Sequence, residues 1–135
     1  GNMLETEQHL KLAATLEPER LHNQVNYAML LAKLQRYEEA RQILEPMIEK
    51  YDDNLAVLNL YGELLIGSGN YDEATVFFQR VLDIEPDFVN SLYNIALCLA
   101  KQNKPEQAKP YIERIKQINP NDARTKQILD MLKMK

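Results

Sequence analysis

Hydrophobic residues in the middle of the chain recur at the spacing of one face of an α-helix. Leu58, Tyr61, Leu64 and Leu65 step by three, three and one residues, which places them on one side of a helix. A second cluster with similar spacing follows at residues 77–82. The pattern therefore predicts two consecutive amphipathic helices.

A short polar segment separates the two clusters. Residues 67–70 have the sequence Gly-Ser-Gly-Asn, in which glycine disfavours helix and asparagine can cap the helix that follows. Asp72 and Glu73 then lie in the first turn of the second helix, where carboxylates interact favourably with the helix dipole. The predicted unit is helix, short turn, helix.

The same unit returns along the chain every 34 residues. Seven sets of similar residues share this interval, and Pro18 lies two intervals before Pro86. The sets are Tyr27, Tyr61 and Ile95; Ala28, Gly62 and Ala96; Leu31, Leu65 and Leu99; Ala40, Ala74 and Ala108; Leu44, Phe78 and Ile112; Met47, Val81 and Ile115; and Pro86 and Pro120. Several columns with one period indicate an internal repeat.

Small residues in two of these columns have a physical reason. Alanine or glycine lets two helix backbones approach closely, and a larger side chain there is expected to cost about 1–3 kcal/mol by overpacking. One helix pair cannot bury its apolar face alone, so successive pairs must stack to form a continuous core.

These features resemble the tetratricopeptide repeat (TPR) family, whose units are 34-residue helix–turn–helix repeats. The residues that match the family pattern in the middle unit are Gly62, Gly69, Tyr71, Asp72, Glu73, Ala74, Phe78 and Pro86. The resemblance implies an all-α, right-handed α-solenoid that forms a single array over residues 1–135. It implies three full repeats, at about 21–54, 55–88 and 89–122.

Both ends of the array depart from a full repeat. Residues 1–20 are interpreted as a partial repeat that supplies a second helix without its first. Residues 122–135 are interpreted as a capping helix, because Asp130 and Lys133 stand where earlier units have the small residue and the leucine. The sequence leaves open whether the chain is a segment of a longer array.

Two prolines fall inside predicted second helices. Pro46 lies within residues 38–50 and Pro110 within 105–118. Proline removes a helix hydrogen bond and costs about 3 kcal/mol in a regular helix interior. We expect both helices to continue through the proline with a bend.

Composition argues against several classes of function. The single cysteine and two histidines offer little for a metal site, and His9 and His22 are too far apart to bind one ion from one helix. No glycine-rich phosphate loop is present. We therefore expect no cofactor, no metal and no catalytic residues, which predicts a protein that is not an enzyme.

Charge and hydropathy limit the class of partner. The net charge of −4 argues against nucleic acid as a partner. No apolar run approaches the roughly 18 residues of a membrane span, so we expect no membrane span in this chain. Cys98 shares a column with Leu30 and Leu64 and is expected to be a small buried residue. His9 shares one with Ile43 and is expected to be partly buried.

The resemblance also implies a binding surface. In TPR proteins the first helices line a concave groove that holds partner segments. The residues expected to line it here are His22, Asn26, Met29, Lys33, Asn59, Leu60, Glu63, Ile66, Asn90, Tyr93, Asn94, Leu97, Lys101 and Arg124, with Gln127 as an extension.

Asparagines in this set suggest a way to bind peptide backbone. An asparagine amide both donates and accepts hydrogen bonds, so Asn26, Asn59 and Asn94 could pair with an extended segment of any sequence. The apolar members would supply pockets. The sequence departs from the TPR subtype that grips a terminal carboxylate, since Val25 and Met29 stand where that clamp has a lysine and an asparagine.

The sequence thus predicts a non-catalytic protein–protein interaction module, a scaffold or adaptor, that binds a peptide or helix of a protein partner in its concave groove. The alternative is a structural role, either through self-association as a homodimer or as an intramolecular scaffold segment of a longer TPR protein. The partner's identity is not encoded in these patterns. Cytoplasm is the default compartment, and the sequence also leaves open an exported form with a removed leader.

Overall fold

The computed structural model of the chain describes residues 3–17 and 20–133. These residues form eight α-helices and no strand. The helices are α1 (Met3–Leu16), α2 (Leu21–Lys33), α3 (Tyr37–Lys50), α4 (Leu55–Gly67), α5 (Tyr71–Ile84), α6 (Val89–Lys101), α7 (Pro105–Ile118) and α8 (Ala123–Leu132). The all-α prediction is confirmed.

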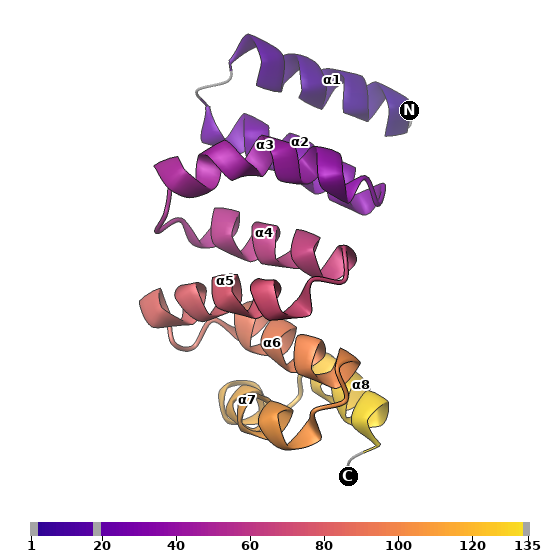
Figure 1. Cartoon of the computed structure of the whole chain (residues 1–135), viewed down its shortest axis with the longest axis vertical. Helices are drawn as coiled ribbons and strands as arrows, with labels where there is room; N and C mark the ends of the chain where they lie inside the picture. The colour runs from indigo at the N-terminus through magenta and orange to yellow at the C-terminus, as the bar shows by residue number, and fades with distance from the viewer. Residues whose placement is uncertain (1–2, 18–19, 134–135) are drawn as a thin grey trace.

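The helices stack into an elongated array with the two termini at opposite ends (Figure 1). Sequence neighbours pack as pairs, α2 with α3, α4 with α5 and α6 with α7. The first helix of each pair begins at residue 21, 55 or 89, at the interval of 34 seen in the sequence. The exact division into repeats at 21–54, 55–88 and 89–122 stays a prediction, and Pro18 lies outside the described residues.

The small columns lie where the two helices of a pair meet. Ala28, Ala40, Ala74 and Ala96 have no exposed surface. A Cβ atom added to Gly62 would lie 2.6 Å from two ring carbons of Phe78, which is itself fully buried. Close packing at the crossing thus explains why this column holds only glycine and alanine.

Each helix pair turns through a residue in the left-handed backbone region. Gln35, Gly69 and Asn103 have φ angles of 61°, 81° and 55° and occupy the same place in successive units. The backbone N–H one residue later donates to a carbonyl five positions earlier, as from Asn70 to Leu65. This is the Schellman arrangement that ends a helix, and glycine adopts it without steric cost.

Both prolines lie inside continuous helices, as expected. Pro46 is within α3 and Pro110 within α7. The bend at each proline stays a prediction.

The first helices form the inner side of the array. Among the described residues, α2, α4, α6 and α8 contact one another in sequence order, whereas the second helices make no backbone contact with each other. Helices are closer together on the inside of a curved stack, so the concave side is the side of the first helices. Helix α8 packs mainly on α6.

Two expectations about burial have opposite outcomes. Cys98 is fully buried, as predicted. His9 is exposed, so the expectation of partial burial is wrong. Helix α1 lacks a first helix beside it in the described chain, and the column of His9 has nothing to pack on. Most of its apolar side chains are exposed for the same reason, as with Leu12 and Leu16 at 56% and 70%.

Candidate functional site

The first helices place most of the expected groove residues on accessible surface. Those exposed are His22, Asn26, Met29, Lys33, Glu63, Asn90 and Lys101, and those half-buried are Asn59, Ile66, Tyr93, Leu97 and Arg124. Gln127 is also exposed. Leu60 and Asn94 present little surface, since both are 7% exposed. These two residues occupy equivalent positions of successive repeats, between one first helix and the next. Ile128 occupies the same position in α8 and is also buried.

A polar network joins α4 to α6 at the floor of this surface. The Ser91 hydroxyl donates to the side-chain oxygen of Asn59 at 3.1 Å, and the Asn94 amide donates to the same oxygen at 3.4 Å. The Asn59 amide in turn donates to a carboxylate oxygen of Glu63 at 3.1 Å. Asn59 and Asn94 therefore hold two units together, and their amides are already used within the protein.

Glu63 lies at the end of this network in a crowded environment. Loss of hydration raises the pKa of its carboxyl group, and hydrogen bonds from Asn94 and Asn59 act in the opposite direction. The side chain still presents exposed surface on the concave side. It supplies the acidic group among the expected groove residues.

Arg124 forms a second polar cluster between α6 and α8. Its guanidinium donates to the Asn90 side-chain oxygen at 2.8 Å and to Asp122 at 3.0 Å. It also lies 4.9 Å from the centre of the Tyr93 ring, a cation–π distance. The bond from Arg124 lowers the pKa of Asp122. The cluster fixes the Tyr93 ring at the edge of the concave side.

A cavity of about 270 Å³ opens on the concave side between the first two helix pairs. It is lined by Met29, Ala32, Lys33, Tyr37, Leu60 and Glu63. Four of these residues were expected from the sequence. Tyr37 was not, because it begins a second helix. Its ring lies against Gly67, where an added Cβ would overlap it, and that glycine is the signal that could have revealed the contact.

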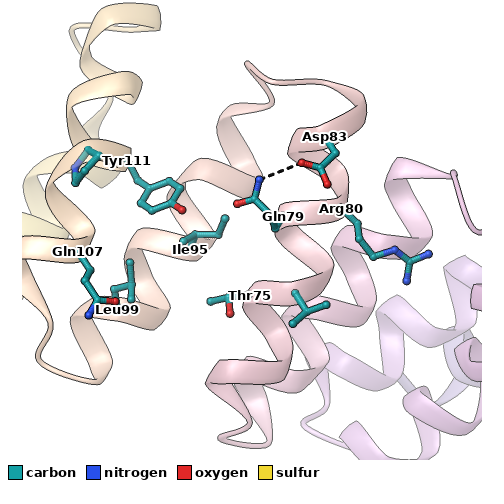
Figure 2. A pocket seen from close by; sticks show the side chains of 10 residues that line it. Thr75, Gln79, Arg80, Asp83, Ile95, Leu99, Gln107 and Tyr111 are labelled. Carbon is teal, nitrogen blue, oxygen red and sulfur yellow. Dashed lines mark hydrogen bonds between the residues drawn. The ribbon is translucent and has the colours of Figure 1, made fainter.

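A larger groove of about 760 Å³ lies on the outer side, between α5 and α7 with α6 as its floor (Figure 2). It is lined by Thr75, Val76, Gln79, Arg80, Asp83, Ile95, Leu99, Gln107, Pro110 and Tyr111. None of these was expected as a binding residue. The sequence signal that could have revealed this groove is a difference between repeats. Thr75 and Ile95 stand where the preceding unit has the larger Arg41 and Tyr61.

The described residues contain no group of three or more histidine, cysteine, aspartate or glutamate side chains arranged to hold a metal ion. No helix within the described part of the chain is both long and apolar enough to cross a membrane.

Comparison with known proteins places this geometry in a family context. The sequence model of the tetratricopeptide repeat matches residues 1–64 and 65–132. The Drosophila melanogaster protein O-mannosyl-transferase Tmtc3 is 33% identical over 88 residues, which cover 62% of this chain and 10% of the transferase. Mouse tetratricopeptide repeat protein 21A is 38% identical over 86 residues, 58% of this chain and 6% of that protein.

Solved structures show the same fold at low sequence identity. A tetratricopeptide repeat protein from Parabacteroides merdae superposes with a TM-score of 0.81 at 18% identity, over 97% of this chain and 52% of that one. The chain thus spans a tenth or less of the curated relatives and about half of this structural neighbour.

Proposed function

The chain belongs to the tetratricopeptide repeat family, and we propose that it is a non-catalytic protein-interaction module whose concave face binds a segment of a partner protein. The observation that carries the proposal is the concave surface itself. It combines exposed apolar side chains with a cavity of about 270 Å³ on the inner side of the array. The name of the fly relative states a transferase activity, and we do not extend this activity to the present chain because the match covers 10% of the fly protein's length.

Apolar anchors are the main source of affinity in this proposal. Met29 is 45% exposed at the rim of the cavity, and Leu97 and Tyr93 are half-buried further along the face. A few such anchors carry most of the binding energy in protein interfaces. Because the amides of Asn59 and Asn94 are used within the protein, backbone pairing with the partner falls to Asn26 and to the N–H groups of Asn90, whose oxygen accepts from Arg124.

Charge at the face favours a segment with acidic groups flanking its apolar residues. Lys33 and Lys101 occupy the same column at the ends of α2 and α6 and are exposed. Arg124 adds a third cation, partly neutralised by Asp122. Glu63 lies between the lysine positions and interrupts the positive surface. The proposed partner segment is therefore apolar at its centre and acidic at its ends.

Affinity capture with matched variants tests this function. The bait is the whole chain, compared with a concave variant, Met29→Glu/Lys101→Glu, and an outer-face variant, Ile84→Glu/Lys104→Glu. Both variants change the net charge equally, and Met29 and Ile84 are 45% and 48% exposed. We expect a protein that the wild type and the outer-face variant retain and the concave variant loses. Equal retention by both variants would move the site off the concave face.

A structural role is the second candidate, and the exposed apolar face of α1 favours it. Four large apolar side chains of this helix are 52–70% exposed, those of Met3, Leu4, Leu12 and Leu16. Exposed apolar surface that is contiguous marks interaction sites in soluble proteins. A second copy or another segment packed there would cover them. Light scattering over a range of concentrations tests this role. A dimer that Leu12→Glu/Leu16→Glu converts to a monomer would support it, and a monomer throughout would exclude self-association.

A further inference from the structure

The outer groove between α5 and α7 is a second surface that the concave-face proposal does not use. Its floor is apolar, formed by Ile95 and Leu99 of α6, and Val76, Pro110 and Tyr111 form apolar parts of its walls. Val76 is 57% exposed. Its volume of about 760 Å³ is within the range of small-ligand sites.

The equivalent gap one unit earlier shows what fills such a space. Between α3 and α5, the Tyr61 ring meets the Phe77 ring edge-on, with centroids 4.8 Å apart and an interplanar angle of 77°. The Arg41 Nε atom donates to the Tyr61 hydroxyl at 3.0 Å. An aromatic ring, held by a second ring and by a hydrogen bond at its hydroxyl, occupies this gap from within the chain.

The same three columns differ between α5 and α7. Ile95 replaces Tyr61, Thr75 replaces Arg41, and Tyr111 replaces Phe77. The groove therefore keeps an aromatic ring on its wall, that of Tyr111. It lacks the second ring and the guanidinium group that fill the gap between α3 and α5. The open groove is the space that these two side chains would occupy.

Polar groups in the groove are suited to an uncharged ligand. Arg80 extends away from the opening (Figure 2), where it donates to the Asp52 carbonyl at 3.0 Å and lies 5.4 Å from the Phe77 ring centre. Asp83 accepts from Gln79 at 3.2 Å. Both charges are thus engaged within the protein. Gln79 and Tyr111 point toward one another across the opening (Figure 2).

We propose that this outer groove binds a tyrosine side chain presented by an uncharged segment of a partner protein. The entering ring takes the place that Tyr61 holds in the preceding unit, edge-on to Tyr111 and over Ile95. Its hydroxyl can donate to the side-chain oxygen of Gln79, whose N–H group donates to Asp83, and the Gln107 amide lines the same groove. The array then has two binding faces, and a partner at one face leaves the other open.

Titration of the whole chain by two-dimensional NMR tests the proposal. The probes are N-acetyl-tyrosine amide, the matched N-acetyl-alanine amide and free p-cresol. We expect the tyrosine amide to shift resonances of α5, α6 and α7 at the groove, with little effect from the alanine amide. Shifts confined to the concave face, or equal shifts with alanine, would overturn the proposal. Binding of p-cresol without the tyrosine amide would assign the groove to small phenols instead.

Filling the groove from within supplies the matched variant. Thr75→Arg/Ile95→Tyr rebuilds the side chains of the preceding unit and is expected to weaken tyrosine-amide binding at least tenfold. Val76→Asp, at an exposed position, places an uncompensated charge in the groove and is expected to weaken binding at least fivefold without disturbing the fold. Binding that survives both changes contradicts the proposal.

The reverse change in the earlier gap is a further test. Arg41→Thr/Tyr61→Ile removes the internal ring between α3 and α5, so a folded variant should gain a second set of tyrosine-amide shifts there. If the variant does not fold, the Thr75→Arg/Ile95→Tyr and Val76→Asp results decide alone. A folded variant with no new binding contradicts the argument that the earlier gap is the template.

Discussion

Asn59 shows how a side chain that faces a predicted groove can serve to hold the array together. Its oxygen accepts from Ser91 and Asn94, and its amide donates to Glu63. Buried or half-buried amides are stable only when their hydrogen bonds are made, and here the donors to the Asn59 oxygen come from the next unit. The residue therefore contributes to stacking, and the neighbouring exposed side chains are left to meet a partner.

Cys98 is expected to be chemically inert in the folded protein. Burial raises the pKa of its thiol to about 12, so at pH 8 roughly one molecule in ten thousand carries the reactive thiolate. Ellman's reagent should not react with the native chain and should react fully in guanidinium chloride. A surface variant, Lys109→Cys, is the positive control. Rapid reaction of native Cys98 would contradict its burial.

Glu63 is expected to make stability depend on pH in a defined direction. Its pKa is raised above the unfolded value, so the folded state binds the proton more tightly. Its contribution to stability is present below the unfolded pKa and is lost as pH rises through the folded pKa. Glu63→Gln keeps an oxygen for Asn59 and removes the titrating carboxyl group.

The measurement is thermal unfolding of wild type and Glu63→Gln between pH 4 and pH 7. The stability of the variant relative to wild type should increase as pH rises over this range. A relative loss of stability toward pH 7 would mean that the charge itself is stabilising.

At the scale of helices, the close crossing of α4 and α5 depends on Gly62, which has no side chain. Gly62→Ala puts a methyl group 2.6 Å from the Phe78 ring, and Phe78 is fully buried. We expect a loss of about 1–3 kcal/mol in the free energy of unfolding, as for other overpacked cores. Urea unfolding measures it. The loss should be smaller in a Phe78→Leu background, and equal losses in the two backgrounds would exclude this contact as the cause.

Proline within α3 gives a second prediction at this scale. Pro46 lies inside a continuous helix and is exposed, so its replacement changes the backbone more than the packing. Pro46→Ala restores an N–H donor and is expected to raise the free energy of unfolding by about 1–3 kcal/mol. Urea unfolding monitored by circular dichroism checks it. A neutral or destabilising effect would show that the helix depends on the proline.

For the whole molecule, repetition made the fold predictable and its exceptions hard to foresee. The columns of Ala28 and Ala40 report contacts inside each unit, which recur and can be read from spacing alone. Burial of Asn94 depends on how one first helix packs on the next. The outer groove depends on Thr75 and Ile95 lacking the bulk of Arg41 and Tyr61, so it is visible only when the same gap is compared between units.

The central claim is that a partner protein binds the concave face, and site-specific photo-crosslinking tests it most directly. Benzoylphenylalanine replaces Met29 in one protein and Ile84 in another, two positions of similar exposure on a first helix and on a second helix. We predict that the Met29 position crosslinks to a partner protein, that excess wild-type chain suppresses this product, and that the Ile84 position does not give the same product. Equal yield of the same product from Ile84, or a product formed only with a second copy of this chain, would contradict the claim.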